Sequence, residues 1–177
     1  MATLAPDRIG GVVALAPLVL PEVRLEHLLF GPRSVPGPGD LLAATARASS
    51  DRLLFPSLWR AMFLPEAMPQ RMRDAFPFAL AAKPAAVTRV AEDAMAANPD
   101  LLRLIASAAG CRVPVRILGG DRDLVVRNGA HGKILAALMP NAAYADLPGM
   151  GHMIHHFAAQ QVLAAVEDIT IRREPPS

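Results

Sequence analysis

The stretch Val113-Pro-Val-Arg-Ile-Leu-Gly-Gly-Asp-Arg-Asp123 decides the fold class. Its apolar first part predicts a β-strand over 113–119, which ends in a sharp glycine-containing loop. An alanine- and leucine-rich helix is expected over 130–139, a second strand over 142–147 and a closing helix over 160–169. Strands and helices that alternate with short connections are typical of βαβ units. The sequence therefore predicts an α/β fold built on a parallel sheet.

A further strand is expected near the N-terminus. Residues 9–15 form a nearly continuous apolar run that is rich in valine. Such a run is typical of a strand that is buried on both faces of a parallel sheet. The sequence thus predicts about three parallel strands, at about 9–16, 113–119 and 142–147, with helices packed on the sheet.

Residues 21–110 have a different character, because prolines divide them into short helical patterns and no comparable strand candidate occurs there. One helix is predicted to begin near Pro84, and a separate one to follow Asp100 as its N-cap. The methionine and aromatic side chains of this segment are expected to form its core. They are Trp59, Met62, Phe63, Met68, Met72, Phe76, Phe78 and Met95. We therefore predict a core made of residues 1–20 and 111–177, and a helical part made of residues 21–110.

Composition and charge exclude several classes of protein. Of the 177 residues, 53% are hydrophobic and 5% aromatic, which suits one domain with an aliphatic core. The longest apolar run, residues 9–20, contains a proline and is shorter than the roughly 20 residues of a membrane-spanning helix, so no membrane partner is expected. The net charge is +2 and the basic residues are scattered, so no nucleic-acid partner is expected. The N-terminal residues lack a charged leader before an apolar run, which favours a cytoplasmic protein.

Two loops after predicted strands carry ionisable groups. Asp121 and Asp123 follow the strand at 113–119, and His152 follows the strand at 142–147. Loops after the carboxyl ends of parallel strands gather at one edge of the sheet. A carboxylate that bonds one ring nitrogen of a histidine fixes its tautomer, as in a catalytic triad. The pattern favours Asp123 with His152 as an acid–base pair. Asp121 is a second candidate for the acid. Either aspartate, taken alone, could instead be a turn former.

Other candidate sites carry weaker signals. His152, His155 and His156 have the spacing of one helical turn, but the motif lacks the glutamate of a His-Glu-x-x-His zinc site and has no nearby third ligand. We therefore expect no metal and no cofactor. Cys111 is the only cysteine, which excludes a disulfide framework. It precedes the strand at 113–119, so a small buried hydrophobe is a better interpretation than a nucleophile.

Three segments together resemble the α/β-hydrolase superfamily. Val113 to Val126 is similar to its acid-bearing strand and loop, and Leu138-Met-Pro-Asn-Ala-Ala-Tyr-Ala-Asp-Leu-Pro-Gly-Met-Gly-His152 to its histidine-bearing segment. Pro6 to Pro17 is similar to the strand after the nucleophile helix. The resemblance implies a partial α/β-hydrolase fold with a helical cap over 21–110. It also implies serine-hydrolase-type hydrolysis of a small apolar ester-like substrate, as in esterase-like and haloperoxidase-like members, with Asp123 as the catalytic acid and His152 as the base.

The sequence departs from this family at the nucleophile. It contains no Gly-x-Ser-x-Gly, the motif that holds the attacking serine. We therefore expect an N-terminally truncated chain with poor activity. The alternative is a non-catalytic remnant that binds an apolar ligand or a partner. In either case the strand at 9–16 is expected to expose apolar surface at a sheet edge, and such an edge favours self-association.

Overall fold

The structure is a computed structural model that describes residues 6–22, 25–46 and 52–171. Within these residues the chain divides into two compact units. The first takes in residues through Leu20, the segment Met62–Glu66 and the residues from Leu102 onward. The second takes in Pro21–Ala61 and Ala67–Leu101. The division differs from the expected boundaries at two places, because Met62–Glu66 and the residues from Leu102 group with the sheet.

The first unit is built on a three-stranded parallel sheet in the order β1-β2-β3. The strands are β1 (Val12–Leu15), β2 (Val115–Gly120) and β3 (Ala142–Leu147). Val12 pairs with Val115, and Val115 pairs with Ala142. The prediction of three parallel strands with flanking helices is confirmed.

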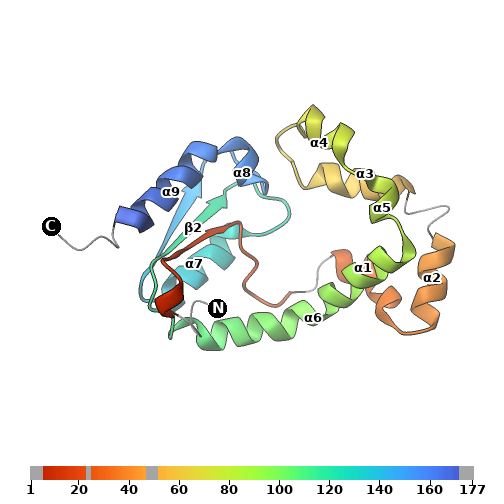
Figure 1. Ribbon diagram of the computed structural model, residues 1–177, viewed down its shortest axis with the longest axis horizontal. Helices are drawn as coiled ribbons and strands as arrows, with labels where there is room; N and C mark the ends of the chain where they lie inside the picture. The colour runs from red at the N-terminus through yellow and green to blue at the C-terminus, as the bar shows by residue number, and fades with distance from the viewer. Residues whose placement is uncertain (1–5, 23–24, 47–51, 172–177) are drawn as a thin grey trace. The chain divides into compact units, whose positions relative to one another are not determined.

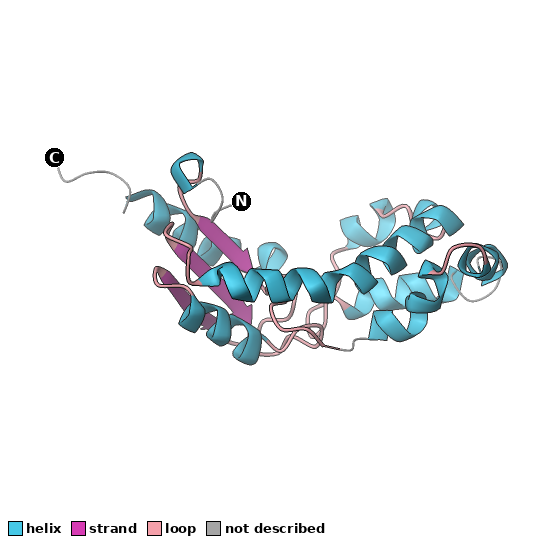
Figure 2. Ribbon diagram, turned by 90° about the horizontal axis from the view of Figure 1, so that it is seen from below, coloured by secondary structure: helices cyan, strands magenta, loops and turns pink. Residues whose placement is uncertain are grey.

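Helices cover both faces of this sheet (Figures 1 and 2). Successive residues of a strand point to opposite faces, so each strand contributes to two layers of core. Val115 and Ile117 of β2 pack in one cluster with Leu135 of α7 (Asn128–Leu138). Leu118 packs in another cluster with residues of α8 (Ile154–Phe157) and α9 (Ala159–Ile171). Five of the six residues of β2 are buried, as its central place requires.

Strand β1 lies at the edge of the described sheet. It follows a short 3-10 helix, η1 (Pro6–Arg8), and pairs with β2 on one side. All four residues of β1 are half-buried. The sequence predicts exposed apolar surface along this strand, whereas its side chains are half-buried in the structure.

The second unit is helical. Its elements are α1 (Leu25–Phe30), η2 (Gly31–Ser34), α2 (Pro38–Ala46), α3 (Arg52–Ala61), α4 (Gln70–Ala75), α5 (Phe78–Ala81) and the first part of α6 (Pro84–Ala108). Phe30, Val87 and Ala91 form its buried core, and the ring of Phe30 stacks on that of Phe55 at 5.6 Å.

The prediction of two helices between Pro84 and residue 108 is wrong, because α6 is one helix with Pro99 inside it. A proline removes one backbone donor from a helix and crowds the preceding turn. Here packing outweighs that cost: Ala91, before the proline, lies in the core of the second unit, and Ile105, after it, packs on the cluster around β2.

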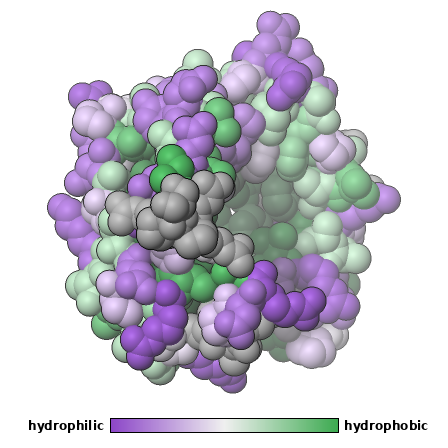
Figure 3. All heavy atoms as spheres, turned by 60° about the vertical axis from the view of Figure 1, so that its left-hand side comes forward, coloured by the Kyte–Doolittle hydropathy of each residue, from purple (hydrophilic) through white to green (hydrophobic). Residues whose placement is uncertain are grey.

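Apolar side chains also reach the surface. Hydrophobic residues appear at several places between hydrophilic ones on the face shown in Figure 3. Among the residues whose exposure the structure describes, Leu124 and Ile171 are the most exposed large apolar side chains. In the described part of the chain no helix combines the length and the apolar character needed to cross a bilayer.

Candidate active site

The loops that follow β2 and β3 are joined to each other by backbone contacts. The Gly149 N–H donates to Oδ1 of Asp121 at 2.6 Å, and the Arg122 N–H donates to the carbonyl of Met150 at 3.0 Å. Gly120 allows this approach, because a Cβ at that position would overlap the carbonyl groups of Met150 and Gly151. Neighbouring parallel strands end at the same sheet edge, so the two loops meet there.

Asp123 and His152 come together in this region, although 29 residues separate them. Nδ1 of His152 lies 2.9 Å from Oδ2 of Asp123. The side chain of Asp123 is 1% exposed and that of His152 is 19% exposed. The acid is thus shielded from water while the histidine ring remains within reach of a small molecule.

The carboxylate of Asp123 is held as an acceptor. Its Oδ1 receives the backbone N–H groups of Val125 at 2.7 Å and Val126 at 2.9 Å. Burial alone raises the pKa of Asp123, but the hydrogen bond from His152, the two backbone N–H groups and the charge interaction with His152 outweigh it. The net pKa of Asp123 is therefore lowered below 3.8, and the group is ionised at neutral pH.

An ionised carboxylate accepts hydrogen bonds and donates none. The proton between Asp123 and His152 therefore lies on Nδ1 of the histidine. In the neutral ring this leaves Nε2 with a free electron pair. The arrangement produces the tautomer that a general base requires.

Asn128, at the start of α7, is a residue that the sequence analysis missed. It is 2% exposed, and its Nδ2 donates to Oδ2 of Asp123 at 2.6 Å and to the Gly120 carbonyl at 3.3 Å. The same carboxylate oxygen thus accepts hydrogen bonds from both Asn128 and His152. Gly119 makes room for it, because a Cβ there would lie 2.6 Å from Cβ of Asn128. The close pair of glycines before the acid was the only sequence signal of this contact.

The other candidate residues lie outside the Asp123–His152 contact. Asp121 is exposed and bonds the backbone of Gly149. His156 packs with its ring 5.6 Å from that of Phe63, and His155 is exposed. Cys111 is 2% exposed within the core. Among residues 6–22, 25–46 and 52–171, no three His, Cys, Asp or Glu side chains gather as a metal site would require.

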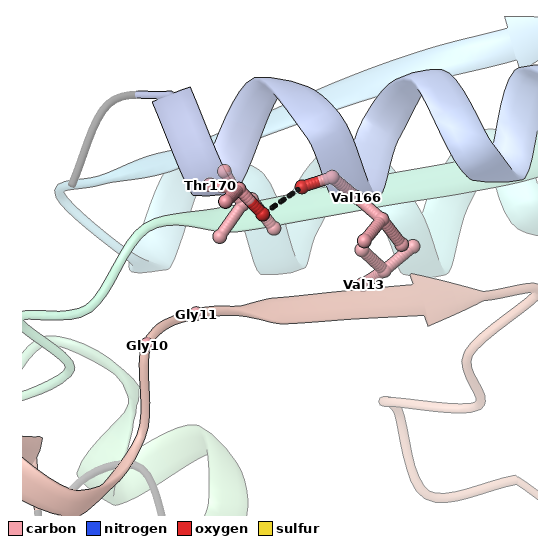
Figure 4. Close-up of a pocket in the computed structure, with 6 residues that line it drawn as sticks. Gly10, Gly11, Val13, Val166 and Thr170 are labelled. Atoms are coloured by element: carbon pink, nitrogen blue, oxygen red, sulfur yellow. Dashed lines mark hydrogen bonds between the residues drawn. The ribbon is translucent and has the colours of Figure 1, made fainter. Parts of the chain in front are cut away.

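A cavity of about 440 Å³ lies beside β1 and α9, apart from these loops. Its lining is Gly10, Gly11, Val13, Val166, Ile169 and Thr170. Figure 4 shows Val13 on the strand facing Val166 on the helix. The lining contains no ionisable side chain, so this cavity lacks the groups that acid–base chemistry needs.

Comparison with solved structures identifies the fold. An α/β-hydrolase enzyme from a Medee basin deep-sea metagenome library aligns over 99% of this chain and 61% of its own, with a TM-score of 0.69 and 15% identity. A 2-hydroxy-6-oxo-6-phenylhexa-2,4-dienoate hydrolase of a Rhodococcus species aligns over 96% and 58%, with a TM-score of 0.67 and 16% identity. This chain has part of an α/β-hydrolase fold. The α/β-hydrolase resemblance seen in the sequence is thereby confirmed at the level of the fold.

The similarity covers only part of each solved structure. A bromoperoxidase of Bacillus anthracis aligns over 96% of this chain and 61% of its own, with a TM-score of 0.65 and 18% identity. The α/β-hydrolase fold of this chain thus spans about 60% of the length of these structures. No protein-family model and no curated protein matches the sequence.

Proposed function

We propose that this chain carries the acid and the base of a serine-type hydrolase that acts on a small apolar ester-like substrate. Asp123 is the acid and His152 is the base. The observation that supports this proposal is the 2.9 Å contact between the buried carboxylate and Nδ1 of the partly exposed ring. Residues 21–110 are the helical cap in this proposal.

The proposed chemistry assigns one step to each group. In a serine hydrolase with such a pair, Nε2 of the histidine takes the proton of the serine hydroxyl while the serine oxygen bonds to the ester carbonyl carbon, and this is the role proposed for His152. The charged form of Asp123 stabilises the imidazolium that results. His152 then returns the proton to the leaving alcohol, and water releases the acid product by the same route. The reaction requires no cofactor.

The 177 residues contain no Gly-x-Ser-x-Gly, so this chain alone is proposed to be a poor catalyst. His152 can still act as a base toward water, and positioned proton transfer contributes about 10²–10⁴-fold. We expect slow hydrolysis of p-nitrophenyl acetate by the wild-type chain. The rate is expected to fall to the buffer rate in His152→Ala and to be unchanged in His155→Ala, the matched control. Equal rates for the wild type and His152→Ala would refute the catalytic proposal.

A second candidate function is binding without catalysis, and the half-buried edge strand β1 favours it. A second copy of this chain can pair along such an edge, because the outer backbone groups of an edge strand lie open. We expect a concentration-dependent increase in mass by sedimentation. A substitution of Val13 by proline removes one backbone donor from β1 and is expected to reduce the association. A chain that is monomeric at all concentrations would exclude this candidate.

A further inference from the structure

The segment Met62–Glu66 lies between two helices of the second unit but belongs to the first. Phe63 is fully buried there. Its ring lies 5.6 Å from the ring of His156 and 6.4 Å, edge-on, from that of Phe157. Both of these residues lie on α8, which begins two residues after the candidate base. The segment is therefore anchored on the helix that follows His152.

A second contact holds the segment directly on the histidine loop. Oε1 of Glu66 accepts the backbone N–H of Gly151 at 3.0 Å, and Gly151 immediately precedes His152. A Cβ at Gly151 would overlap the carbonyl of Leu64 and would lie 2.7 Å from Oε2 of Glu66. The loop and the segment thus meet at a distance that only a glycine allows.

The second carboxylate oxygen of Glu66 adds an independent observation. Oε2 is buried and has no hydrogen-bond partner among the described residues. A buried acceptor without a partner lowers the stability of the folded state. Stability alone therefore explains poorly why a carboxyl side chain is buried in this position, whereas the backbone hydrogen bond from Gly151 gives it a role.

We propose that Glu66 is a positioning residue for His152. Its carboxylate fixes the peptide before the histidine from one side, while the contact between Gly120 and the Met150 carbonyl limits the same loop from the other. Together they keep Nδ1 of His152 within hydrogen-bonding distance of Asp123. This inference rests on the proposed function only for its catalytic meaning, because the contacts exist whether or not the chain turns over a substrate.

The inference is tested by NMR on the full 177-residue chain, without substrate. In Glu66→Ala we expect the amide of Gly151 to exchange with solvent about tenfold faster than in the wild type, because it has lost its acceptor. We also expect the ring nitrogens of His152 to change from the Nδ1–H form toward a mixture of tautomers. Glu92→Ala, which removes a carboxylate from an exposed ion pair on α6, is the matched control.

Two further variants separate positioning from a general loss of stability. Glu66→Gln keeps an acceptor for Gly151 and is expected to show the wild-type tautomer and exchange rate. Gly151→Ala forces the histidine loop and the segment Met62–Glu66 apart and is expected to reproduce Glu66→Ala. Gly129→Ala, whose Cβ would meet nothing within 4 Å, is expected to leave His152 unchanged.

The proposal is overturned if Glu66→Ala leaves the exchange of Gly151 and the signals of His152 as in the wild type. It is also overturned if Glu66→Gln behaves like Glu66→Ala, because the acceptor is then not the cause. These outcomes do not depend on ester hydrolysis. A chain that passes this test but shows no turnover dependent on His152 retains the positioning role and loses the proposed function.

Discussion

Replacing Asp123 by asparagine tests the hydrogen bonding of the candidate site, because the substitution keeps the size of the side chain and changes its charge, its donors and its acceptors. Oδ1 of Asp123 receives two backbone N–H groups, from Val125 and Val126. An amide NH₂ cannot occupy that position, since it would face two donors. The amide oxygen of Asp123→Asn must therefore lie at Oδ1, and its NH₂ group at the position of Oδ2.

The new NH₂ group then faces the two donors whose hydrogen bonds the carboxylate accepted. Nδ2 of Asn128 lies 2.6 Å and Nδ1 of His152 lies 2.9 Å from Oδ2. Asn128 can rotate its amide and offer Oδ1, which is buried and has no hydrogen-bond partner among the residues that the structure describes, but it then loses its hydrogen bond to the Gly120 carbonyl. Nδ1 of His152 can accept a hydrogen bond from the NH₂ group only if the ring proton moves to Nε2. The substitution therefore inverts the tautomer of the candidate base.

The cost in stability follows from these contacts. A hydrogen bond to a charged group contributes about 1.5–3 kcal/mol, and two such bonds are lost and partly replaced by neutral ones. We expect Asp123→Asn to lower the free energy of unfolding by about 2–4 kcal/mol. Since 1 kcal/mol shifts Tm by about 2–4 °C in a chain of this size, Tm is expected to fall by about 4–16 °C.

The assay is nitrogen NMR of histidine-labelled protein, together with thermal unfolding. In the wild type, Nδ1 of His152 is expected to give the signal of a protonated ring nitrogen, and in Asp123→Asn that of an unprotonated one. His131 serves as an internal reference, because its Nδ1 accepts the backbone N–H groups of Val19 at 3.1 Å and Leu20 at 3.0 Å and is unprotonated in both proteins. If His152 keeps its proton on Nδ1 in Asp123→Asn, the reasoning about the pair is refuted.

Three further predictions concern stability. The folded-state pKa of Asp123 is lowered below 3.8, so its ionised form stabilises the fold above that pH, and this contribution is lost as the pH falls through the folded-state pKa. The difference in unfolding free energy between the wild type and Asp123→Asn should therefore shrink on acidification. A difference that stays constant with pH would contradict this prediction. A Cβ at Gly132 would overlap the ring of Tyr144, so Gly132→Ala should cost about 1–3 kcal/mol in urea unfolding, whereas Gly129→Ala on the same helix should cost nothing; equal effects would show that the contact is unimportant. His131→Phe removes the acceptor of two backbone N–H groups and should cost about 1–3 kcal/mol for each group left buried; a variant as stable as the wild type would show that these groups reach water.

The central strand of the sheet could be predicted from the sequence because it is apolar and buried on both faces. The apolar run 113–119 became Val115–Gly120, and the strand at 142–147 was found at its expected bounds. Asp123 and His152 could be paired in advance for a topological reason, since each follows a strand and the two strands are neighbours. The continuous helix across Pro99 could not be predicted, because tertiary packing on both sides of the proline overrides its local tendency to end a helix.

The residues that support the candidate site were missed for a different physical reason. Asn128 and Glu66 act through contacts with backbone at positions 8 and 85 residues away, and a single sequence contains no record of such contacts. What the sequence did contain was the glycines opposite them. Gly149 has φ +77 and is required by its backbone conformation, but Gly120 and Gly151 are not in the left-handed region.

Gly120 and Gly151 are instead required by what lies against their Cα atoms: the Met150 carbonyl for Gly120, and the carbonyl of Leu64 together with the carboxylate of Glu66 for Gly151. A glycine next to a catalytic candidate therefore indicates either a turn or a close neighbour, and the two can be separated by substitution. Alanine at Gly149 costs backbone strain and leaves the packing intact, whereas alanine at Gly151 displaces the segment that holds the base. If both variants disturbed the ring of His152 equally, the turn alone would position it, and the contact with Glu66 would be incidental.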